Sequence, residues 1–539
     1  WQMLEALLTL LPLTVAQLQL AFAERSQVDY AEVAVRALAA LGTAERPTDL
    51  ALALDYRIRH LLVDEFQDTS INQFTLLERL TAGWENGDGR TLFLVGDPMQ
   101  SIYRFREAQV GLFLRAQQHG IGTLRLTPLT LSVNFRSQQG VVDWVNAAFS
   151  GLFPSQADAS SGAVPYSPSS AQHAVLAGTA VQVHPFYSRN LEPEAEQILT
   201  LIREAQTEKL QTAILVRSRK HLGALVPRLR RAGIRFRAME LESLGERPVV
   251  RDLMALTCAL THPADRTAWL AVLRAPWCGL ELNDLFVLAG DDLRTPVPSL
   301  LADDARWARL SAAGKVRLAR VRGILRAACT ERGRGTLREQ VERLWLQLAG
   351  PCTLATLEDL EDAEAFLDLL EEFDAGGALT SVETLSKALT ELFARPDPQA
   401  DDGLQLMTIH KAKGLEFDVV IVPGLGFSTG RTQRPLLMYL ERTRTVAGPD
   451  LLLAPLNARG TDHDPLYELV LALRKDQEAF EQLRLLYVAA TRAKQRLHLL
   501  GHTTFKEQDG KKIVQPPRKY SLLAALWPAV KDVFEQALT

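Results

Sequence analysis

Two short acidic sequences are candidates for catalytic chemistry. Residues 63–70 read VDEFQDTS, so Asp64 and Glu65 directly follow an apolar run. Paired carboxylates suit nucleotide hydrolysis, because one can hold Mg²⁺ while the other orients or activates water against a γ-phosphate. A single Asp-Glu pair is more often a solvated acidic turn. A second acidic turn, Gly96-Asp97, follows the next apolar run, which favours the catalytic interpretation.

The second sequence, residues 96–106, reads GDPMQSIYRFR. Gly96 permits a close approach of the backbone to a ligand, and Gln100 can hydrogen-bond a phosphate or its attacking water. Tyr103 and Phe105 alternate with arginines, a pattern that suits stacking of bases and contact with a strand backbone. For one of the two aromatic side chains, burial in a core remains an alternative.

The elements around these sequences predict a parallel sheet. An apolar strand at 58–63, a helix at 71–80, a polar loop at 83–89 and a second apolar strand at 91–95 follow one another. In α/β proteins of this rhythm the chemistry lies at the carboxyl ends of the strands, which is where both acidic turns occur.

The rest of the chain continues as a second α/β region interrupted by helices. Strand signals disappear from about 248 to 393 and return at 404–409 and 419–422, before a long helix at 465–494 and a strand at 496–500. We therefore expect these segments: helices at 1–55, the end of a first α/β domain at 56–150, a linker at 151–178, the first part of a second α/β domain at 179–247, a helical insertion at 248–395, and the second part with a tail at 396–539.

Composition narrows the class of protein. The 539 residues are 47% hydrophobic and 23% charged, an ordinary globular mix that excludes collagen-like, disordered and disulfide-scaffold chains. The net charge of −4 gives no overall basic field for nucleic acid. The four cysteines lack the spacing of a metal knuckle, so we expect reduced thiols and no zinc or iron–sulfur site. Polar residues and Pro12 interrupt the leucine-rich residues 4–20, so we expect a cytoplasmic protein without a signal peptide or membrane span.

Three further motifs complete a family pattern. Residues 131–137 read LSVNFRS, residues 406–417 read LMTIHKAKGLEF, and residues 484–494 read RLLYVAATRAK. With the two acidic sequences, these motifs resemble the UvrD/RecB group of superfamily 1 DNA helicases, and their wording is most similar to the RecB and AddA helicase-nuclease proteins. The resemblance implies two RecA-like P-loop NTPase-type domains facing across an ATP cleft, the first of them incomplete, with a helical insertion in the second.

The resemblance also implies a role for each matching residue. Asp64 would bind Mg²⁺, Glu65 would polarise the attacking water, and Gln100 would sense the γ-phosphate. Arg136 and Arg492 would reach the γ-phosphate from opposite domains, Arg492 in the manner of an arginine finger. The expected ATP-binding residues are Gly96, Asp97, Arg136, Gly414, Glu416 and Arg492, with Glu416 bonded to the ribose and Gly414 allowing the tight turn before it.

Single-stranded DNA is the implied track. The residues expected to line it are Tyr103, Phe105, Arg106, Thr408 and His410. A structural role for His410 stays open, and Lys411 and Lys413 could equally form a solvated basic face. A local basic stretch without carboxylates offers a further phosphate-contact face; it comprises Lys209, Arg217, Arg219, Lys220, Arg228, Arg230, Arg231, Arg235 and Arg237. For Arg228–Arg231, surface arginines on an amphipathic helix remain the alternative.

One element of such a motor is absent from the 539 residues. A glycine-rich loop ending in Gly-Lys-Ser or Gly-Lys-Thr does not occur, since Gly314-Lys315 and Gly510-Lys511 lack the hydroxyl residue. In the family this loop precedes the DEFQ motif, so we expect a fragment that begins at Trp1 after it, and we expect no carboxylate–lysine nuclease site after Lys494.

Two hypotheses follow. The chain is either part of an ATP- and Mg²⁺-dependent translocase that moves 3′ to 5′ on single-stranded or partly duplex DNA with a partner subunit, or a non-hydrolysing DNA-binding or regulatory protein. Retention of the catalytic residues favours the first hypothesis, with no appreciable ATPase for the chain alone. The reading frame upstream of Trp1 would distinguish the two.

Overall fold

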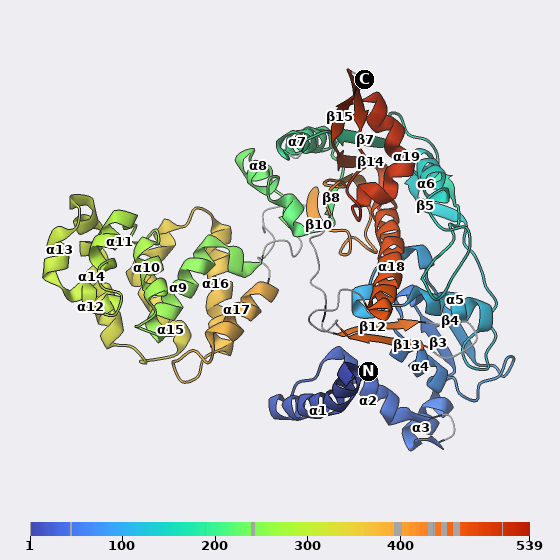
Figure 1. Ribbon diagram of the computed structural model, residues 1–539, viewed down its shortest axis with the longest axis horizontal. Coiled ribbons are helices and arrows are strands. Elements are labelled where there is room, and N and C mark those ends of the chain that lie inside the picture. The colour runs from blue at the N-terminus through green and yellow to red at the C-terminus, as the bar shows by residue number, and fades with distance from the viewer. Residues whose placement is uncertain are drawn as a thin grey trace. The chain divides into compact units, whose positions relative to one another are not determined.

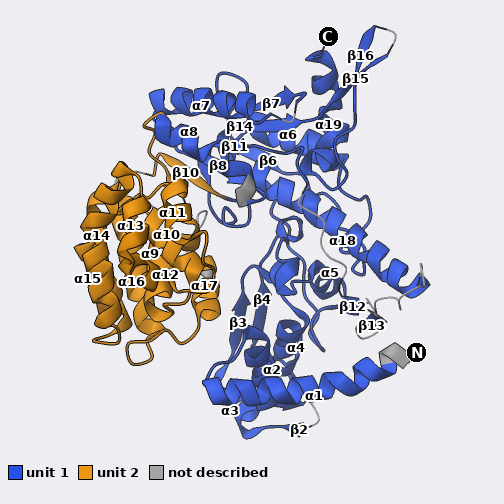
Figure 2. Cartoon of the chain, turned by 60° about the vertical axis from the view of Figure 1, so that its left-hand side comes forward, with its two compact units in different colours: residues 1–231, 408–539 blue, residues 232–407 orange. Residues whose placement is uncertain are grey.

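The protein is an α/β molecule with two compact units, as Figure 2 shows in a computed structural model. Residues 1–231 and 408–539 form the first unit, and residues 232–407 form the second. The residues that the structure describes are 2–43, 46–188, 190–238, 243–392, 402–428, 435, 437–442, 450–455, 464–508 and 510–538. The predicted α/β fold class is confirmed.

The first unit begins with three helices, α1 (Gln2–Arg25), α2 (Tyr30–Leu41) and α3 (Asp49–Arg57), coloured blue in Figure 1. Helix α1 is exposed along its apolar length, and its segment Glu5–Arg25 is long and apolar enough, with a mean hydropathy of 1.7, to cross a membrane. The polar residues that interrupt this segment are few and mostly uncharged. A single helix of this length and composition does not establish a membrane span. The cytoplasmic location stays a prediction.

A two-stranded parallel sheet follows, made of β3 (His60–Val63) and β4 (Thr91–Leu94). Between them lies α4 (Ile71–Leu80), which starts at a capping box of Ser70 and Gln73 and matches the expected helix residue for residue. Helix α4 and α5 (Val110–His119) bury one small core. On the sheet itself Leu62 and Phe93 are exposed, although parallel sheets are normally covered on both faces.

The expected linker is partly regular structure. Strand β5 (Val133–Gln138) leads into α6 (Gln139–Ser150), and β6 (Ser170–His173) pairs with β5 in parallel. The segment 151–178, expected as a linker, therefore includes one short strand. The serine- and proline-rich composition concealed a short strand that depends on its partner.

The second sheet of the first unit contains four parallel strands in the order β7-β14-β11-β8. Strands β8 and β11 are buried along almost their whole length, as expected for parallel strands covered on both faces. The bounds of the strands are β7 Val181–Phe186, β8 Thr212–Val216, β11 Phe417–Val422 and β14 Ala493–His502. The helices of this region are α7 (Glu192–Thr207), α8 (Val226–Arg231), α18 (Pro465–Ala490) and α19 (Leu522–Gln536). Two antiparallel hairpins, β12 (Leu437–Arg442) with β13 (Asp450–Pro455) and β15 (Phe505–Gln508) with β16 (Lys511–Val514), complete it.

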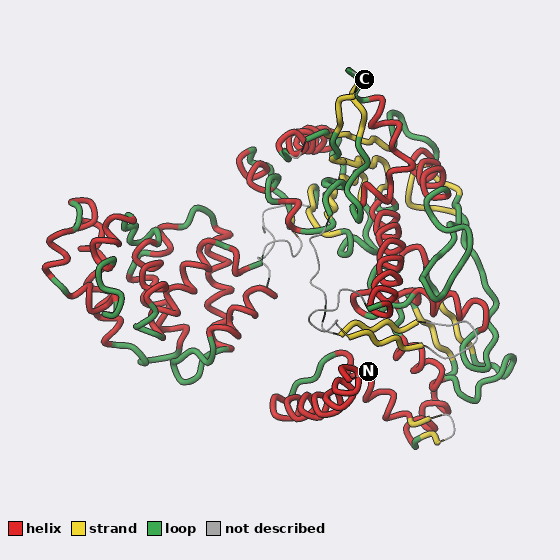
Figure 3. Tube along the Cα trace, in the orientation of Figure 1, coloured by secondary structure: helices red, strands yellow, loops and turns green. Residues whose placement is uncertain are grey.

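The second unit is almost entirely helical, as the red tube from α9 to α17 shows (Figure 3). Its large core includes the buried rings of Trp269, Trp277, Trp345 and Phe366. The helices are α9 (Pro248–Thr261), α10 (Arg266–Arg274), α11 (Leu282–Ala289), α12 (Val297–Ala302), α13 (Asp304–Arg309), α14 (Ala312–Thr330), α15 (Leu337–Gln347), α16 (Leu357–Glu372) and α17 (Val382–Glu391). The second unit also contains a short pair of parallel strands, β9 (Arg237–Ala238) and β10 (Leu404–Thr408). Most of the polar stretch 395–403 lies outside the described residues.

Candidate nucleotide and nucleic-acid site

The first acidic turn lies at the carboxyl end of β3, where both carboxylates are exposed. Glu65 adopts a left-handed backbone, with φ of 51°, and its N–H donates to Asp64 Oδ1 at 2.8 Å. A left-handed conformation costs energy for a residue with a side chain, and such strain is typical of functional sites. The chain therefore turns sharply between the two carboxylates.

Gln67 connects the two acidic turns. Its side chain is buried, its amide donates to Glu65 Oε2 at 2.5 Å, and its carbonyl accepts the N–H of Asp97 at 3.0 Å. A Cβ at Gly96 would lie 2.3 Å from the side-chain oxygen of Gln67 and 3.2 Å from its backbone nitrogen, so any larger residue there would displace the Gln67 amide. No role was predicted for Gln67, although its position between Glu65 and Asp68 in the first acidic motif is a signal that could have indicated one.

Asp97 organises its own turn. Its carboxylate accepts the N–H of Met99 at 2.9 Å and the side-chain amide of Gln100 at 2.8 Å, and burial raises the pKa of Asp97. The other end of the Gln100 amide accepts a hydrogen bond from Arg492 Nη2 at 3.2 Å. Gln100 is therefore held between a carboxylate and a guanidinium group.

Arg492 lies between α18 and β14 and is 1% exposed. Besides Gln100, it donates to the carbonyl oxygens of Val488 and Leu415, each at 3.2 Å. Burial lowers the pKa of Arg492 to about 10, so the group still carries its charge at neutral pH. A buried guanidinium with carbonyl partners is an oriented positive charge of the kind that stabilises a transferring phosphoryl group.

Arg136 pairs with Glu416, with 2.9 Å between Nε and Oε2, and also donates to the carbonyl of Thr491 at 3.2 Å. The hydrogen bond from Arg136 lowers the pKa of Glu416. Two residues before Glu416, Gly414 has a φ of 84°, a left-handed backbone conformation that suits glycine. Two expected nucleotide ligands from distant parts of the chain thus contact each other directly.

Lys413 contacts the first acidic motif. Its Nζ lies 2.8 Å from Glu65 Oε2 and also pairs with Asp68, and its side chain is 5% exposed. Although burial raises the pKa of Glu65, the hydrogen bond and charge of Lys413 lower it overall. Burial lowers the pKa of Lys413, but Asp68 and Glu65 raise it overall. The interpretation of Lys413 as part of a solvated basic face is therefore wrong.

The expected DNA-binding residues Tyr103, Phe105, Arg106 and His410 form one aromatic cluster. The ring of Phe105 meets those of Tyr103 and His410 edge-on at 5.8 and 5.5 Å, and Arg106 lies over both Tyr103 and Phe105. Tyr103 donates its hydroxyl to the carbonyl of His410 at 3.1 Å, and burial lowers the pKa of His410. Phe105 is 66% exposed. An exposed ring beside an arginine is a stacking platform for bases.

The turn that carries His410 begins at Thr408, the last residue of β10. The carbonyl of Thr408 accepts the N–H of Lys411 at 3.0 Å, and Ile409 N–H donates to Val216 of β8 at 2.9 Å. These bonds anchor the turn to the second sheet of the first unit. The contact that Thr408 makes here is therefore a backbone hydrogen bond within this turn.

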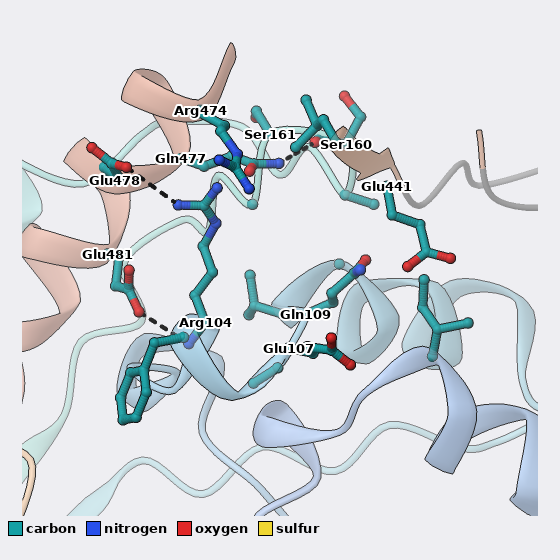
Figure 4. Close-up of a pocket in the computed structure, with 18 of the residues that line it drawn as sticks. Arg104, Glu107, Gln109, Ser160, Ser161, Glu441, Arg474, Gln477, Glu478 and Glu481 are labelled. Carbon is teal, nitrogen blue, oxygen red and sulfur yellow. Dashed lines mark hydrogen bonds and ion pairs between the residues drawn. The ribbon is translucent and has the colours of Figure 1, made fainter. Parts of the chain in front are cut away.

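Charged residues of α18 hold the backbone of the second acidic motif (Figure 4). Glu481 accepts the N–H of Arg104 at 3.1 Å, and the fully buried Arg484 donates to Ser101 at 2.7 Å and Gly162 at 2.8 Å. Arg104, Glu481 and Arg484 line a cavity of about 430 Å³, and Phe105 also belongs to its wall. Arg484 is the first residue of the motif at 484–494, and no such role was predicted for it.

Arginines of the basic stretch form ion pairs and hydrogen bonds with other parts of the chain. Arg228 pairs with Glu192 at 2.9 Å and Glu196 at 3.4 Å, and Arg217 donates to the carbonyl of Tyr520 at 2.8 Å. For Arg228, which lies on α8, the ion pairs support the alternative of a surface arginine on a helix, and Arg217 likewise has a partner within the chain. The phosphate-contact face remains a prediction.

The carboxylates of the first acidic turn could bind Mg²⁺ only together with phosphate oxygens of a nucleotide. Among the described residues, no group of three or more His, Cys, Asp or Glu side chains is placed to hold a metal ion. Asp64 offers one exposed carboxylate, and Mg²⁺ is typically bound through one or two carboxylates together with phosphate oxygens and water. The residues present therefore fit a nucleotide-bound Mg²⁺ and do not form an independent metal site.

Known proteins match almost the whole chain. The UvrD/REP helicase N-terminal domain matches residues 9–120, and the UvrD-like helicase C-terminal domain matches residues 129–288 and 353–504. The chain is 29% identical to an ATP-dependent helicase/nuclease subunit from Exiguobacterium sibiricum, over 89% of this chain and 43% of that protein. It is 27% identical to the protein of the same name from Lysinibacillus sphaericus (90% and 44%) and 28% identical to that from Pelotomaculum thermopropionicum (84% and 41%). The chain thus spans less than half the length of these curated relatives.

Proposed function

Because this chain belongs to the family of UvrD-like DNA helicases, we propose that it carries the water-activating and DNA-contacting residues of an ATP-dependent DNA translocase. We further propose movement 3′ to 5′ along single-stranded DNA in a repair and recombination system. The observation that supports this function best is the link between two sites in one unit. Gln100 contacts Arg492, and five residues further along the chain Phe105 presents an exposed ring.

ATP with its Mg²⁺ supplies the phosphoanhydride bond whose hydrolysis drives such a motor. Asp64 would hold the metal ion, and Glu65 would orient the attacking water and take up its proton. Gln100 and Arg492 would face the γ-phosphate, where oriented donors stabilise developing charge. Glu416, now paired with Arg136, would bond the ribose when nucleotide separates the pair.

The 539 residues hold no glycine-rich phosphate loop. Backbone N–H groups of that loop and its lysine supply most of the binding of the β- and γ-phosphates in P-loop NTPases. We therefore propose that this polypeptide on its own binds nucleotide weakly and does not hydrolyse it.

A partner subunit is part of the proposal. The relatives are named as subunits of a helicase/nuclease, and we propose that this chain likewise works beside a second subunit on single-stranded or partly duplex DNA.

Binding of a fluorescent single-stranded oligonucleotide tests the DNA track. We expect Phe105→Ala to weaken binding by about 5- to 100-fold, because stacking of one base on an aromatic ring contributes about 1–3 kcal/mol. Affinity should also fall steeply between low and moderate salt, since phosphate contacts release counterions. Fluorescence anisotropy measures both effects.

The matched control is Phe286→Ala, which removes an equally exposed ring (69% against 66% for Phe105) from α11 of the second unit. Equal affinities for both variants, or binding that does not respond to salt, would contradict the assignment of the aromatic cluster as the track.

A further inference from the structure

We propose that Lys413 is a positioning residue that couples DNA binding at the aromatic cluster to the position of Glu65. The inference rests on the proposed function, because it has meaning only if the cluster binds single-stranded DNA. It names a second connection between the DNA and nucleotide residues, separate from the one through Gln100 and Arg492.

The ammonium group of Lys413 is held by the first acidic motif. It lies 2.8 Å from Glu65 Oε2 and contacts the carboxylate of Asp68. Gln67 donates to the same Glu65 oxygen at 2.5 Å. The exposed carboxylate of Glu65 therefore has one charged and one neutral donor that define where it points.

The same ammonium group lies over the ring of Tyr103, 5.1 Å from its centre. A lysine at this distance from an aromatic face is attracted by the ring electrons, and the attraction strengthens when water is excluded. Movement of the Tyr103 ring therefore changes the environment of Lys413.

A backbone connection reinforces the contact. The carbonyl of His410 accepts both the hydroxyl of Tyr103 at 3.1 Å and the N–H of Lys413 at 3.4 Å. The ring of His410 in turn meets Phe105 edge-on. The turn 410–413 thus joins the exposed platform to the ammonium group that holds Glu65.

Burial separates this role from direct DNA contact. The Lys413 side chain is 5% exposed, whereas Phe105 is 66% exposed. A phosphate cannot reach an ammonium group that is enclosed by Asp68, Glu65 and the Tyr103 ring. Any effect of Lys413 on DNA affinity must therefore pass through the residues it touches.

A double-mutant cycle on oligonucleotide binding tests the coupling without ATP hydrolysis. The four proteins are the 539-residue chain, Glu65→Gln, Lys413→Met and the double variant, each titrated by anisotropy with a labelled oligo-dT. We expect Glu65→Gln to raise the Kd by about threefold or more in the wild-type background, and to have no effect when Lys413 is already methionine, because residues in one network are not additive. Lys413→Arg, which keeps the charge, should restore the dependence on Glu65.

Lys411→Met is the matched control, since it removes an exposed lysine charge from the same turn. Whatever its own effect on affinity, the effect of Glu65→Gln should persist in that background. Additive effects of Glu65→Gln and Lys413→Met would overturn the inference while leaving the DNA track intact. An unchanged Kd for Glu65→Gln alone would also overturn it, and this measurement does not depend on the folding of the Lys413 variants. If the wild-type chain binds no DNA, the proposed function fails and the inference fails with it.

Discussion

Buried polar residues position side chains of the proposed nucleotide site, among them the exposed Glu65 carboxylate at the end of β3. Gln67 is 1% exposed and Arg492 is 1% exposed, yet each donates to a residue of the proposed nucleotide site. The motifs of the sequence place Asp64, Glu65 and Gln100 close to predicted strand ends, and the structure has them there, while their catalytic roles stay predictions. The burial of Lys413 could not be predicted, since a lysine in a basic run is usually solvated and its carboxylate partners are distant in sequence.

A buried histidine pair provides a prediction at this scale. His498 of β14 lies 3.2 Å from His184 of β7, between Nδ1 and Nε2. Burial, helped by His184, lowers the pKa of His498 from 6.5 to about 4. The unfolded chain therefore takes up a proton below pH 6.5 that the folded chain refuses until about pH 4. Stability is present above pH 6.5 and is lost as the pH falls toward 4.

We expect His498→Gln to reduce this loss. Between pH 7.5 and 5 the wild-type free energy of unfolding should fall by about 2 kcal/mol more than that of the variant, from linkage with the two pKa values. Urea unfolding at both pH values measures the difference. A parallel pH dependence of both proteins would show that His498 does not titrate in this way.

At the scale of elements, the acidic strand ends and the helices followed from local pattern. Helix α4 has the predicted bounds, because its apolar periodicity and end signals are clear in the sequence. Strand β6 was missed, since its residues SAQH carry no strand signal and pair only with β5. Pairing between segments that are distant in sequence is tertiary information that no local pattern contains.

The helical second unit offers a prediction about buried and exposed ion pairs. Arg247, before α9, is buried against α16, with its guanidinium 3.2 Å from Asp359 and in contact with Asp362. Arg338 of α15 also faces α16 but pairs with exposed carboxylates such as Glu371 at 3.2 Å. Removing one partner of a buried pair leaves an uncompensated charge, whereas exposed pairs contribute little.

We expect Arg247→Met to lower the opening free energy of the second unit by about 3–5 kcal/mol, and Arg338→Met to lower it by about 1 kcal/mol or less. Native-state hydrogen exchange of peptides from 248–391, followed by mass spectrometry, reports this unit within the full chain. Similar losses for the two variants would contradict the distinction.

At the scale of the whole molecule, net charge was a poor guide to nucleic-acid binding. The chain carries a charge of −4, yet its family acts on DNA, and the proposed track is a local cluster around Phe105. Sequence order alone predicted the family, because five motifs occur in the right succession. It could not predict that Arg136 and Glu416 pair, since this contact joins segments that only the fold brings together.

We propose that the first unit holds the water-activating and DNA-contacting residues of a helicase motor, while the 539 residues lack the phosphate loop that hydrolysis requires. The most direct measurement is ATP hydrolysis by this polypeptide and by Glu65→Gln, each saturated with oligo-dT. We expect the oligonucleotide to bind and the ATP turnover of the two proteins to be indistinguishable. DNA-stimulated hydrolysis that Glu65→Gln abolishes would contradict it.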